Sequence, residues 1–282
     1  MLAAEIHAIG GSAREVDDMH QDELDLSIEE YSQAIALDPQ DADAYSDRGL
    51  AYYFKDDYDQ AIADYDRAIT LDPQLADAYN NRGAVYYDMG DLGQAIANYD
   101  QVIALDPQDA DAYYNRGNAY HDKGDMDQAI ADFDQAIALD PALAPAYNNL
   151  GLAHSDKGDL DQAIADYDQA IALDPESAGS YYNRGNAYFS IGDLDQAIAD
   201  YDQAISLDPQ DAEAHYNRGN AYYEKGDLDQ AIADYDQAIA LDPQDADAHH
   251  NRGNAHYDKG DLDQAVADYG QAIALDPQYA DG

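Results

Sequence analysis

Cysteine is absent from the 282-residue sequence, so neither a disulfide framework nor thiol chemistry is available. Basic residues are scarce: 13 lysines and arginines stand against 60 aspartates and glutamates, giving a formal net charge of −47. Nucleic acids and anionic membranes both require a basic surface, so this balance argues against either as a partner. It favours a Lys- or Arg-bearing partner, or a high-salt milieu that screens self-repulsion.

Long apolar runs are missing as well. No stretch approaches the length that a membrane-spanning helix requires. The apolar segment 1–9 is short, contains Glu5 and lacks a basic leading segment, so it does not match a signal peptide. These absences lead us to expect a cytoplasmic protein.

Catalytic and cofactor-binding motifs are also lacking. The sequence contains no phosphate-cradling glycine loop, no H-E-x-x-H and no nucleophile elbow. Its carboxylates recur periodically instead of forming one unique pair, and turn acids such as Asp106 and Asp109 lack the spacing of a calcium loop. We therefore predict no enzymatic activity, no cofactor and no bound metal.

What the sequence does contain is one 34-residue unit copied along its length, seen clearly at residues 110–143. A Leu-Asp-Pro signature closes each copy. Its proline recurs every 34 residues without insertion or deletion, as Pro39, Pro73, Pro107, Pro141, Pro175, Pro209, Pro243 and Pro277. A fixed period of this length indicates a stacked array of units and not a globule with one central core.

The first half of the unit predicts a helix over residues 110–123. Tyr113, Gly117 and Tyr120 recur at the spacing of one helical face. Gly124 ends this helix, because glycine tolerates the left-handed backbone that a helix end requires.

The second half predicts another helix, which begins at Asp125. Asp125 and Gln128 have the spacing of a capping box. The apolar face of this helix carries Ala129, Phe133, Ala136 and Ile137. The helix ends before Pro141, which has no amide hydrogen to donate and disfavours helical backbone in the preceding residue. Because Gly117 and Ala129 are small, we expect the two helices to approach each other closely there.

The unit resembles the tetratricopeptide repeat, whose pattern is an aromatic residue, Leu-Gly, Tyr, then Ala, Phe and Pro at fixed spacing. The matching residues are Tyr113, Arg116, Gly117, Tyr120, Ala129, Phe133 and Pro141, with Tyr in place of the usual Trp and Arg in place of Leu. The resemblance implies an all-α fold, a right-handed superhelical α-solenoid of antiparallel helix hairpins. It covers about residues 42–279 in seven full repeats.

We expect the chain to form one elongated domain with four segments. Residues 1–21 form an irregular segment with a short capping helix near Ser12, and residues 22–41 form the second helix of a degenerate repeat. Seven full repeats occupy residues 42–279, and residues 280–282 form a tail without a capping helix. The fourth repeat departs most from the others: it has Leu150 for Arg, His154 for Tyr, and Pro145 at the start of its first helix.

A polar stripe follows the first helix of each repeat, on the side opposite the core. Asn115 and Asn118 belong to it, with Asp111 at its acidic rim. One position of the stripe is asparagine in six repeats: Asn81, Asn115, Asn149, Asn183, Asn217 and Asn251. A second position holds Asn118, Asn186, Asn220 and Asn254. An amide both donates and accepts hydrogen bonds, so a ladder of amides can hold the main chain of an extended peptide.

The family resemblance implies the same use, because first helices line the concave surface of such arrays and similar asparagine ladders bind peptides there. Tyr114, Tyr182 and Tyr216 lie beside the ladder in sequence and would add contact area. The alternative is that the ladder is a solvated helix face inherited by copying.

The arginines and the histidines each allow a structural and a functional interpretation. Arginines occupy a core position as Arg48, Arg82, Arg116, Arg184, Arg218 and Arg252. We predict that each pairs with aspartates of adjacent second helices, because a half-buried guanidinium requires a partner; the alternative is a grip on a ligand carboxylate. His215, His249, His250 and His256 could bind a metal, but other repeats have tyrosine at these positions, which favours simple aromatic replacement.

The leading functional hypothesis is an adaptor that binds an extended, basic peptide or protein segment in its groove. A second hypothesis is a scaffold that assembles with another copy through the last hairpin, for which no capping helix follows. A third is the regulatory arm of a larger multidomain protein.

Overall fold

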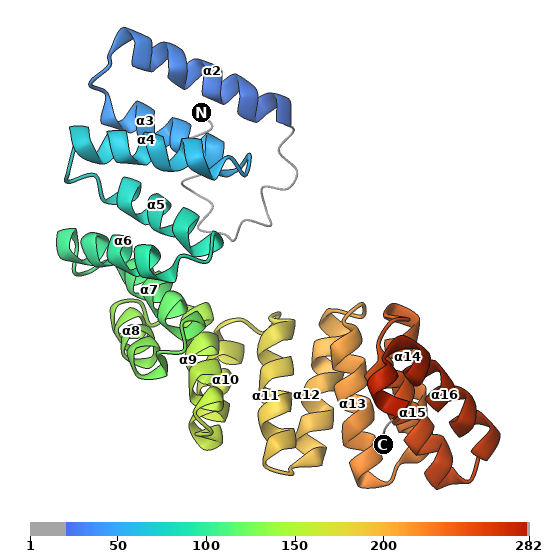
Figure 1. Cartoon of the computed structure of the whole chain (residues 1–282). Helices are drawn as coiled ribbons and strands as arrows, with labels where there is room; N and C mark the ends of the chain where they lie inside the picture. Colours follow the sequence, from blue (N-terminus) through green and yellow to red (C-terminus); the bar gives the residue numbers. More distant parts are fainter. Residues whose placement is uncertain (1–20, 281–282) are drawn as a thin grey trace. The chain divides into compact units, whose positions relative to one another are not determined.

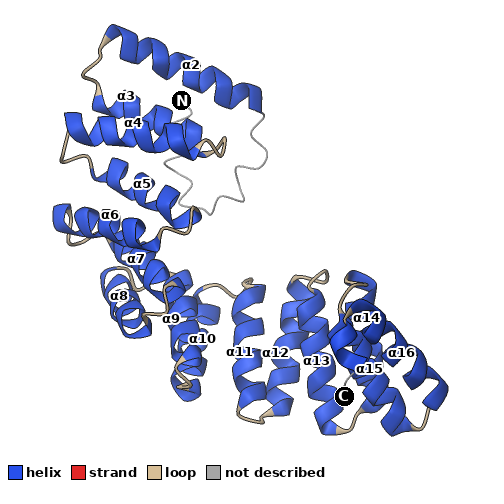
Figure 2. Cartoon of the chain, viewed as in Figure 1, coloured by secondary structure: helices blue, strands red, loops and turns tan. Residues whose placement is uncertain are grey.

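The computed structural model describes residues 21–280, which form α-helices, one short 3-10 helix and no strand (Figures 1 and 2). The capping helix predicted near Ser12 lies outside the described residues, as do residues 281–282 of the predicted tail. The elements are α2 (Gln21–Leu37), α3 (Ala42–Tyr53), α4 (Tyr58–Leu71), α5 (Ala76–Asp88), α6 (Leu92–Leu105), α7 (Ala110–Asp122), α8 (Met126–Leu139), α9 (Ala144–Asp156), α10 (Leu160–Leu173), α11 (Ala178–Ser190), α12 (Leu194–Leu207), α13 (Ala212–Lys225), α14 (Leu228–Leu241), α15 (Ala246–Lys259), α16 (Leu262–Leu275) and η2 (Pro277–Ala280).

Each repeat is an antiparallel hairpin of two helices. The most extensive contacts join the partners of one hairpin, such as α3 with α4 or α13 with α14. Weaker contacts join a second helix to the next first helix, such as α12 to α13, and join consecutive first helices, such as α13 to α15. This nearest-neighbour pattern is that of an α-solenoid, as the repeat predicted.

The contacts divide the chain into two compact units, residues 1–141 and residues 142–282. In the described part of the chain the first unit contains α2 to α8, and the second contains α9 to α16 with η2. This differs from the single domain expected from the repeat. The physical reason lies in the architecture: a repeat contacts only its neighbours, so an array has no central core that would prevent its division between two repeats.

The interior of each hairpin is a close approach between a glycine and an aromatic ring. A Cβ atom added to Gly117 would lie 2.7 Å from Cε1 of Phe133. Ala129 and Phe133 are fully buried. The same contact recurs in the other full repeats with tyrosine as the aromatic residue, for example between Gly219 and Tyr235. The close helix approach predicted at Gly117 and Ala129 is therefore confirmed.

Helix ends follow the predicted turn chemistry at the glycine but not at the predicted cap. Gly124 has φ of 85° after α7, the left-handed backbone that favours glycine. The predicted capping box at Asp125 was wrong, because the Asp125 side chain makes no cap hydrogen bond to α8. The Asp125 Oδ2 atom instead lies 2.7 Å from the Lys123 ammonium. The equivalent Asp159, Asp227 and Asp261 make no side-chain cap bond either. The equivalent Asp57 does cap its helix, accepting from the Gln60 amide.

Candidate functional site

A column of arginines joins the second helices of neighbouring repeats within each unit. Arg116 on α7 donates through Nε and Nη2 to both carboxylate oxygens of Asp132 on α8, at 2.7 Å each. Its Nη1 donates to Asp100 on α6, the second helix of the preceding repeat, at 2.5 Å. Hydrogen bonding to Asp132 raises the pKa of Arg116 above its ordinary value. The guanidinium is therefore a three-point ion-pair clamp.

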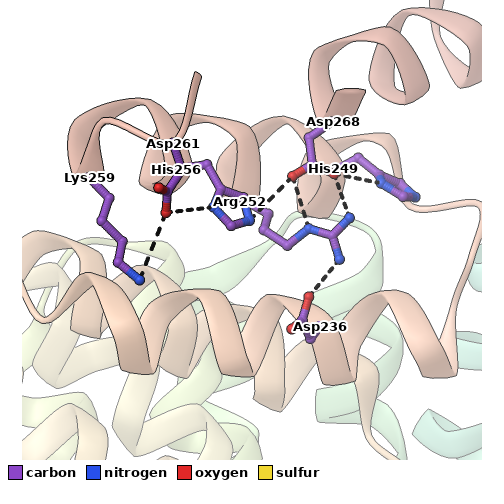
Figure 3. Close-up of polar contacts among 7 residues, drawn as sticks. All are labelled: Asp236, His249, Arg252, His256, Lys259, Asp261 and Asp268. Atoms are coloured by element: carbon purple, nitrogen blue, oxygen red, sulfur yellow. Dashed lines mark hydrogen bonds and ion pairs between the residues drawn. The ribbon is translucent and has the colours of Figure 1, made fainter. Parts of the chain in front are cut away.

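The clamp recurs at Arg184, Arg218 and Arg252, each bound to an aspartate before it and one after it. Figure 3 shows Arg252 between Asp236 and Asp268. Aspartates such as Asp132 that receive two bonds are buried, and a buried carboxylate needs such a partner. The prediction of ion pairs between neighbouring hairpins is confirmed for five of the six arginines, which are engaged by the fold itself. The exception is Arg48, which donates to the Ser32 hydroxyl of the preceding helix.

The fourth repeat provides a different partner for its equivalent acid, Asp166, which is half-buried. Leu150 stands where other repeats have the arginine, so it cannot bond Asp166 on α10. His154, in place of tyrosine, has Nδ1 2.7 Å from Asp166 Oδ2. The two departures noted in the sequence are thus coupled, with the imidazole replacing the guanidinium as partner.

The histidines near the end of the chain surround the last of these acids. His249 Nδ1 lies 3.9 Å from Asp268 Oδ1, and His256 Nε2 lies 3.9 Å from Asp268 Oδ2 (Figure 3). Asp268 already accepts two bonds from Arg252. Within residues 21–280, no group of three or more histidine or acidic side chains has an arrangement that could hold a metal ion.

The amide stripe of the first unit contains a hydrogen bond between two consecutive first helices. Asn115 donates through Nδ2 to Oδ1 of Asn80, at 3.2 Å, across two first helices. Asn81 and Asn118 are half-buried. The Tyr114 ring packs against Phe133, with 6.0 Å between ring centroids.

The acidic rim of the first unit is exposed to solvent. Asp111 is exposed at the start of α7. Partial desolvation, and then the carboxylates of Asp109 and Asp140, raise its pKa. Like-charged neighbours therefore surround this acid, which favours the approach of a cation.

The second unit has a fuller network, in which amides bond across consecutive first helices. Asn217 donates to the Tyr182 hydroxyl at 2.9 Å and to Asn186 Oδ1 at 3.3 Å. In the next repeat, Asn251 donates to the Tyr216 hydroxyl at 2.8 Å and to Asn220 Oδ1 at 3.1 Å. The predicted ladder residues and their tyrosines thus lie together, but they bind one another as well as lining a surface.

Tyrosines of the second helices, buried at Tyr201 and Tyr235, reach the same network. The hydroxyls of Tyr201, Tyr235 and Tyr269 donate to Oδ1 of Asn186, Asn220 and Asn254, at 2.7, 2.8 and 2.9 Å respectively. These bonds tie the stripe to the core of each hairpin. No sequence pattern connected the core aromatic residue with the amide stripe.

Asparagines at the start of the second unit form a smaller group. Asn183 donates to Asn148 Oδ1 at 3.1 Å, and Asn148 donates to Asn149 Oδ1 at 3.1 Å. Asn148, like Asn80 in the first unit, precedes the ladder position by one residue and was not predicted as a site residue. Asn148 takes part because residues 35 positions apart lie opposite each other on consecutive first helices.

A pocket of about 230 Å³ opens where α11, α13, α14 and α15 meet. Its lining comprises Phe189, Asn220, Tyr223, Glu224, Tyr235, Asn251 and Asn254. Three of these residues are predicted ladder asparagines. Glu224 was not singled out from the sequence, although a glutamate where four other repeats have aspartate was a visible signal.

The array of helical hairpins, with its amide-lined pocket, places the chain in the class of α-solenoid repeat proteins. The TPR repeat profile matches residues 19–56, 51–90, 83–124, 117–158, 155–192, 185–226 and 219–260, and the tetratricopeptide repeat profile matches residues 246–279. The chain therefore belongs to the tetratricopeptide repeat family. Members of this family are generally non-enzymatic scaffolds that bind protein or peptide partners.

Solved structures with similar folds include MamA, at 31% identity over 59% of this chain and 97% of that chain, with a TM-score of 0.56. YrrB, described as a TPR protein with an unusual peptide-binding site, is 25% identical over 64% of this chain and 92% of that chain, with a TM-score of 0.57. PilF of Pseudomonas aeruginosa shares the fold at 22% identity, covering 72% of this chain and 92% of that chain, with a TM-score of 0.64. No curated protein sequence matches the chain.

None of the helices within residues 21–280 has the length and apolar character needed to cross a membrane.

Proposed function

We propose that the chain is an adaptor that binds an extended, basic peptide or protein segment along the first helices of its second unit. The observation that carries this proposal is the pocket whose lining includes Asn220, Asn251 and Asn254. An adaptor function agrees with the family, whose members bind protein or peptide partners. Self-association through the last hairpin stays a separate prediction.

Unused hydrogen-bonding atoms in the pocket favour recognition of a main chain. Within residues 21–280, no hydrogen-bond partner engages Oδ1 of Asn251 or Nδ2 of Asn254. One atom is an acceptor and the other is a donor, as peptide N–H and C=O groups require. The bonds from Asn251 to Tyr216 and Asn220 hold its amide in place, so little side-chain entropy is lost on binding.

Charge favours a basic ligand. The chain carries a formal net charge of −47, and a strongly acidic surface raises the rate at which cations associate. Glu213 lies beside the ladder, where its carboxylate accepts from the Tyr182 hydroxyl at 3.1 Å. Acidic groups at the edge of a binding surface steer partners and add specificity more than raw affinity.

Alanine substitution of the ladder tests the proposal. We expect Asn251→Ala and Asn254→Ala each to weaken binding of arginine- and lysine-rich peptides selected on this chain by about fivefold to tenfold, since each removes about one hydrogen bond. Isothermal titration calorimetry measures the affinities. Gln237→Ala is the matched control, because this amide is exposed on α14 and outside the pocket.

Circular dichroism separates a binding effect from loss of fold. Full helicity together with weakened binding in the ladder variants supports the proposal. Affinities equal to that of the Gln237→Ala control would overturn it and leave the asparagines as a structural network alone.

A further inference from the structure

Tyrosine and acid pairs connect successive first helices at a fixed spacing of 35 residues. Tyr53 donates to Asp88 Oδ2 at 2.5 Å, and Tyr223 donates to Asp258 Oδ2 at 2.6 Å. Tyr87 pairs with Asp122 in the same way. The bond to Asp258 raises the pKa of Tyr223 to about 12. In these pairs the tyrosine hydroxyl gives the carboxylate a donor.

One pair in the second unit breaks this rule. At the same spacing, Phe189 occupies the tyrosine position and Glu224 the acid position. Phenylalanine has no hydroxyl, so it cannot donate a hydrogen bond. Within residues 21–280 no hydrogen bond or ion pair engages the Glu224 carboxylate, and both side chains line the pocket. The acid is thus exposed beside an aromatic ring with its hydrogen-bonding capacity unused.

The remaining lining fits a cation. Phe189, Tyr223 and Tyr235 contribute aromatic rings, and Asn251 contributes an unused Oδ1 acceptor. No lysine or arginine lines the pocket. The nearby Lys225 ammonium is bound elsewhere, 2.6 Å from Asp195 Oδ1. Negative charge therefore remains uncompensated at a site with ring faces and acceptors.

We propose that this pocket binds the cationic side chain of an arginine or lysine in the captured segment, with Glu224 as its ion-pair partner. The inference rests on the proposed function and names the side-chain class that this surface selects. Ring faces attract cations, and carboxylate-to-cation hydrogen bonds are about twice as strong as neutral ones. The aliphatic part of either side chain would cover the ring of Phe189.

Other side chains fit the pocket poorly. A ligand carboxylate would lie against Glu224 and be repelled. An apolar side chain would remove water from the Glu224 carboxylate without giving it a partner, which is costly. Selectivity for a cation therefore arises from an acid that has Phe189 in place of a tyrosine donor.

A small probe tests the pocket without requiring a peptide groove. Nα-acetyl-arginine methylamide is titrated into the full chain, with the matching citrulline compound as its neutral isostere, and amide chemical shifts are followed by NMR. We expect shifts at α11, α13 and α15 for arginine, with at least about tenfold weaker binding of citrulline. The first-unit pair of Tyr53 and Asp88 is an internal control, because its carboxylate already has a donor.

Two variants identify the group responsible. Glu224→Gln removes the charge, and Phe189→Tyr supplies the hydroxyl that the other pairs use to engage the acid. We expect each to weaken arginine binding, by about tenfold for Glu224→Gln. Phe189→Tyr reproduces the residue of other repeats, so it preserves the fold. Glu176→Gln is the control, because Glu176 is exposed in the turn before α11 and outside the pocket.

Equal binding of the arginine and citrulline probes, or unchanged binding in Glu224→Gln, would overturn the cation pocket. Peptides that still bind and still depend on Asn251 would then leave the adaptor proposal standing. Conversely, a probe that binds at Glu224 while Asn251→Ala and Asn254→Ala leave peptide affinity unchanged would support the pocket and overturn the ladder.

Discussion

The first helices of the two units follow the same repeat but differ in how their amide stripes are connected. Both units contain arginine clamps, such as Arg116 in the first and Arg218 in the second. In the second unit the Tyr235 hydroxyl donates to Asn220. In the first unit the equivalent Tyr65 hydroxyl is buried without a partner, because Leu50 stands where Asn220 stands.

This difference separates what the fold requires from what a site requires. The clamps recur in both units because each buried aspartate would otherwise lack a partner. The tyrosine-to-amide bonds are missing where the asparagine has become Leu50, and the hairpin of α3 and α4 forms without them. Three repeats of the second unit keep these tyrosine-to-asparagine bonds, and the bonds lie beside a pocket. Because the fold forms without such bonds elsewhere, their presence here favours a role in binding.

The largest expected effect comes from breaking a clamp that both units share. Arg116→Leu leaves the buried Asp132 carboxylate without its ion-pair partner and should lower the free energy of unfolding by about 3 kcal/mol. Adding Tyr120→His copies the solution of the fourth repeat, where His154 bonds Asp166. We expect the double variant to recover about half of the loss, measured by urea denaturation.

Arg67→Leu provides the matched control for Arg116→Leu and its double variant. Arg67 lies over the Tyr45 ring, 5.7 Å from its centroid, so its removal should cost no more than about 1 kcal/mol. If Arg116→Leu is as mild as Arg67→Leu, the clamp does not stabilise the array. If Tyr120→His adds nothing, the coupled substitutions of the fourth repeat have another origin.

A smaller effect sharpens the contrast between the two amide stripes. Tyr235→Phe removes a hydroxyl that donates to Asn220 and should cost about 1 kcal/mol. Tyr65→Phe removes a buried hydroxyl that has no partner, so we expect no loss or a slight gain of stability. Thermal unfolding of the two variants provides the comparison, and equal destabilisation by both would contradict the difference between the units.

Much of the fold could be predicted because the same two-helix pattern recurs in every repeat. The glycine-to-aromatic contact between Gly117 and Phe133 and the ion pairs of Arg116 each follow from one unit read as two helices. Asp125 was predicted incorrectly because the spacing of a capping box does not fix the direction in which the N-cap side chain points, and Asp227 makes no cap bond either. The division into two units depends on contacts between repeats, which a single unit does not specify.

The candidate site could be predicted only in part. The asparagines were visible as a stripe, yet their bonds to Tyr182 and Tyr216 depend on how consecutive first helices are placed. Glu224 was overlooked because its significance comes from a residue 35 positions earlier, Phe189, which lacks the hydroxyl that Tyr53 uses at the equivalent position. The residue pattern of α13 alone cannot show that the hydrogen-bond donor for Glu224 is missing from α11.

The central claim is that the amides of α13 and α15 hold the main chain of an extended ligand. The most direct measurement compares a bound peptide with the same peptide N-methylated at alternate residues, in the natural chain and in Asn251→Ala. We expect N-methylation to weaken binding to the natural chain by about tenfold, because it removes the peptide N–H that Asn251 would accept. The same modification should matter much less in Asn251→Ala, because that variant has already lost the acceptor. Equal affinities of the two peptides for the natural chain would contradict the claim.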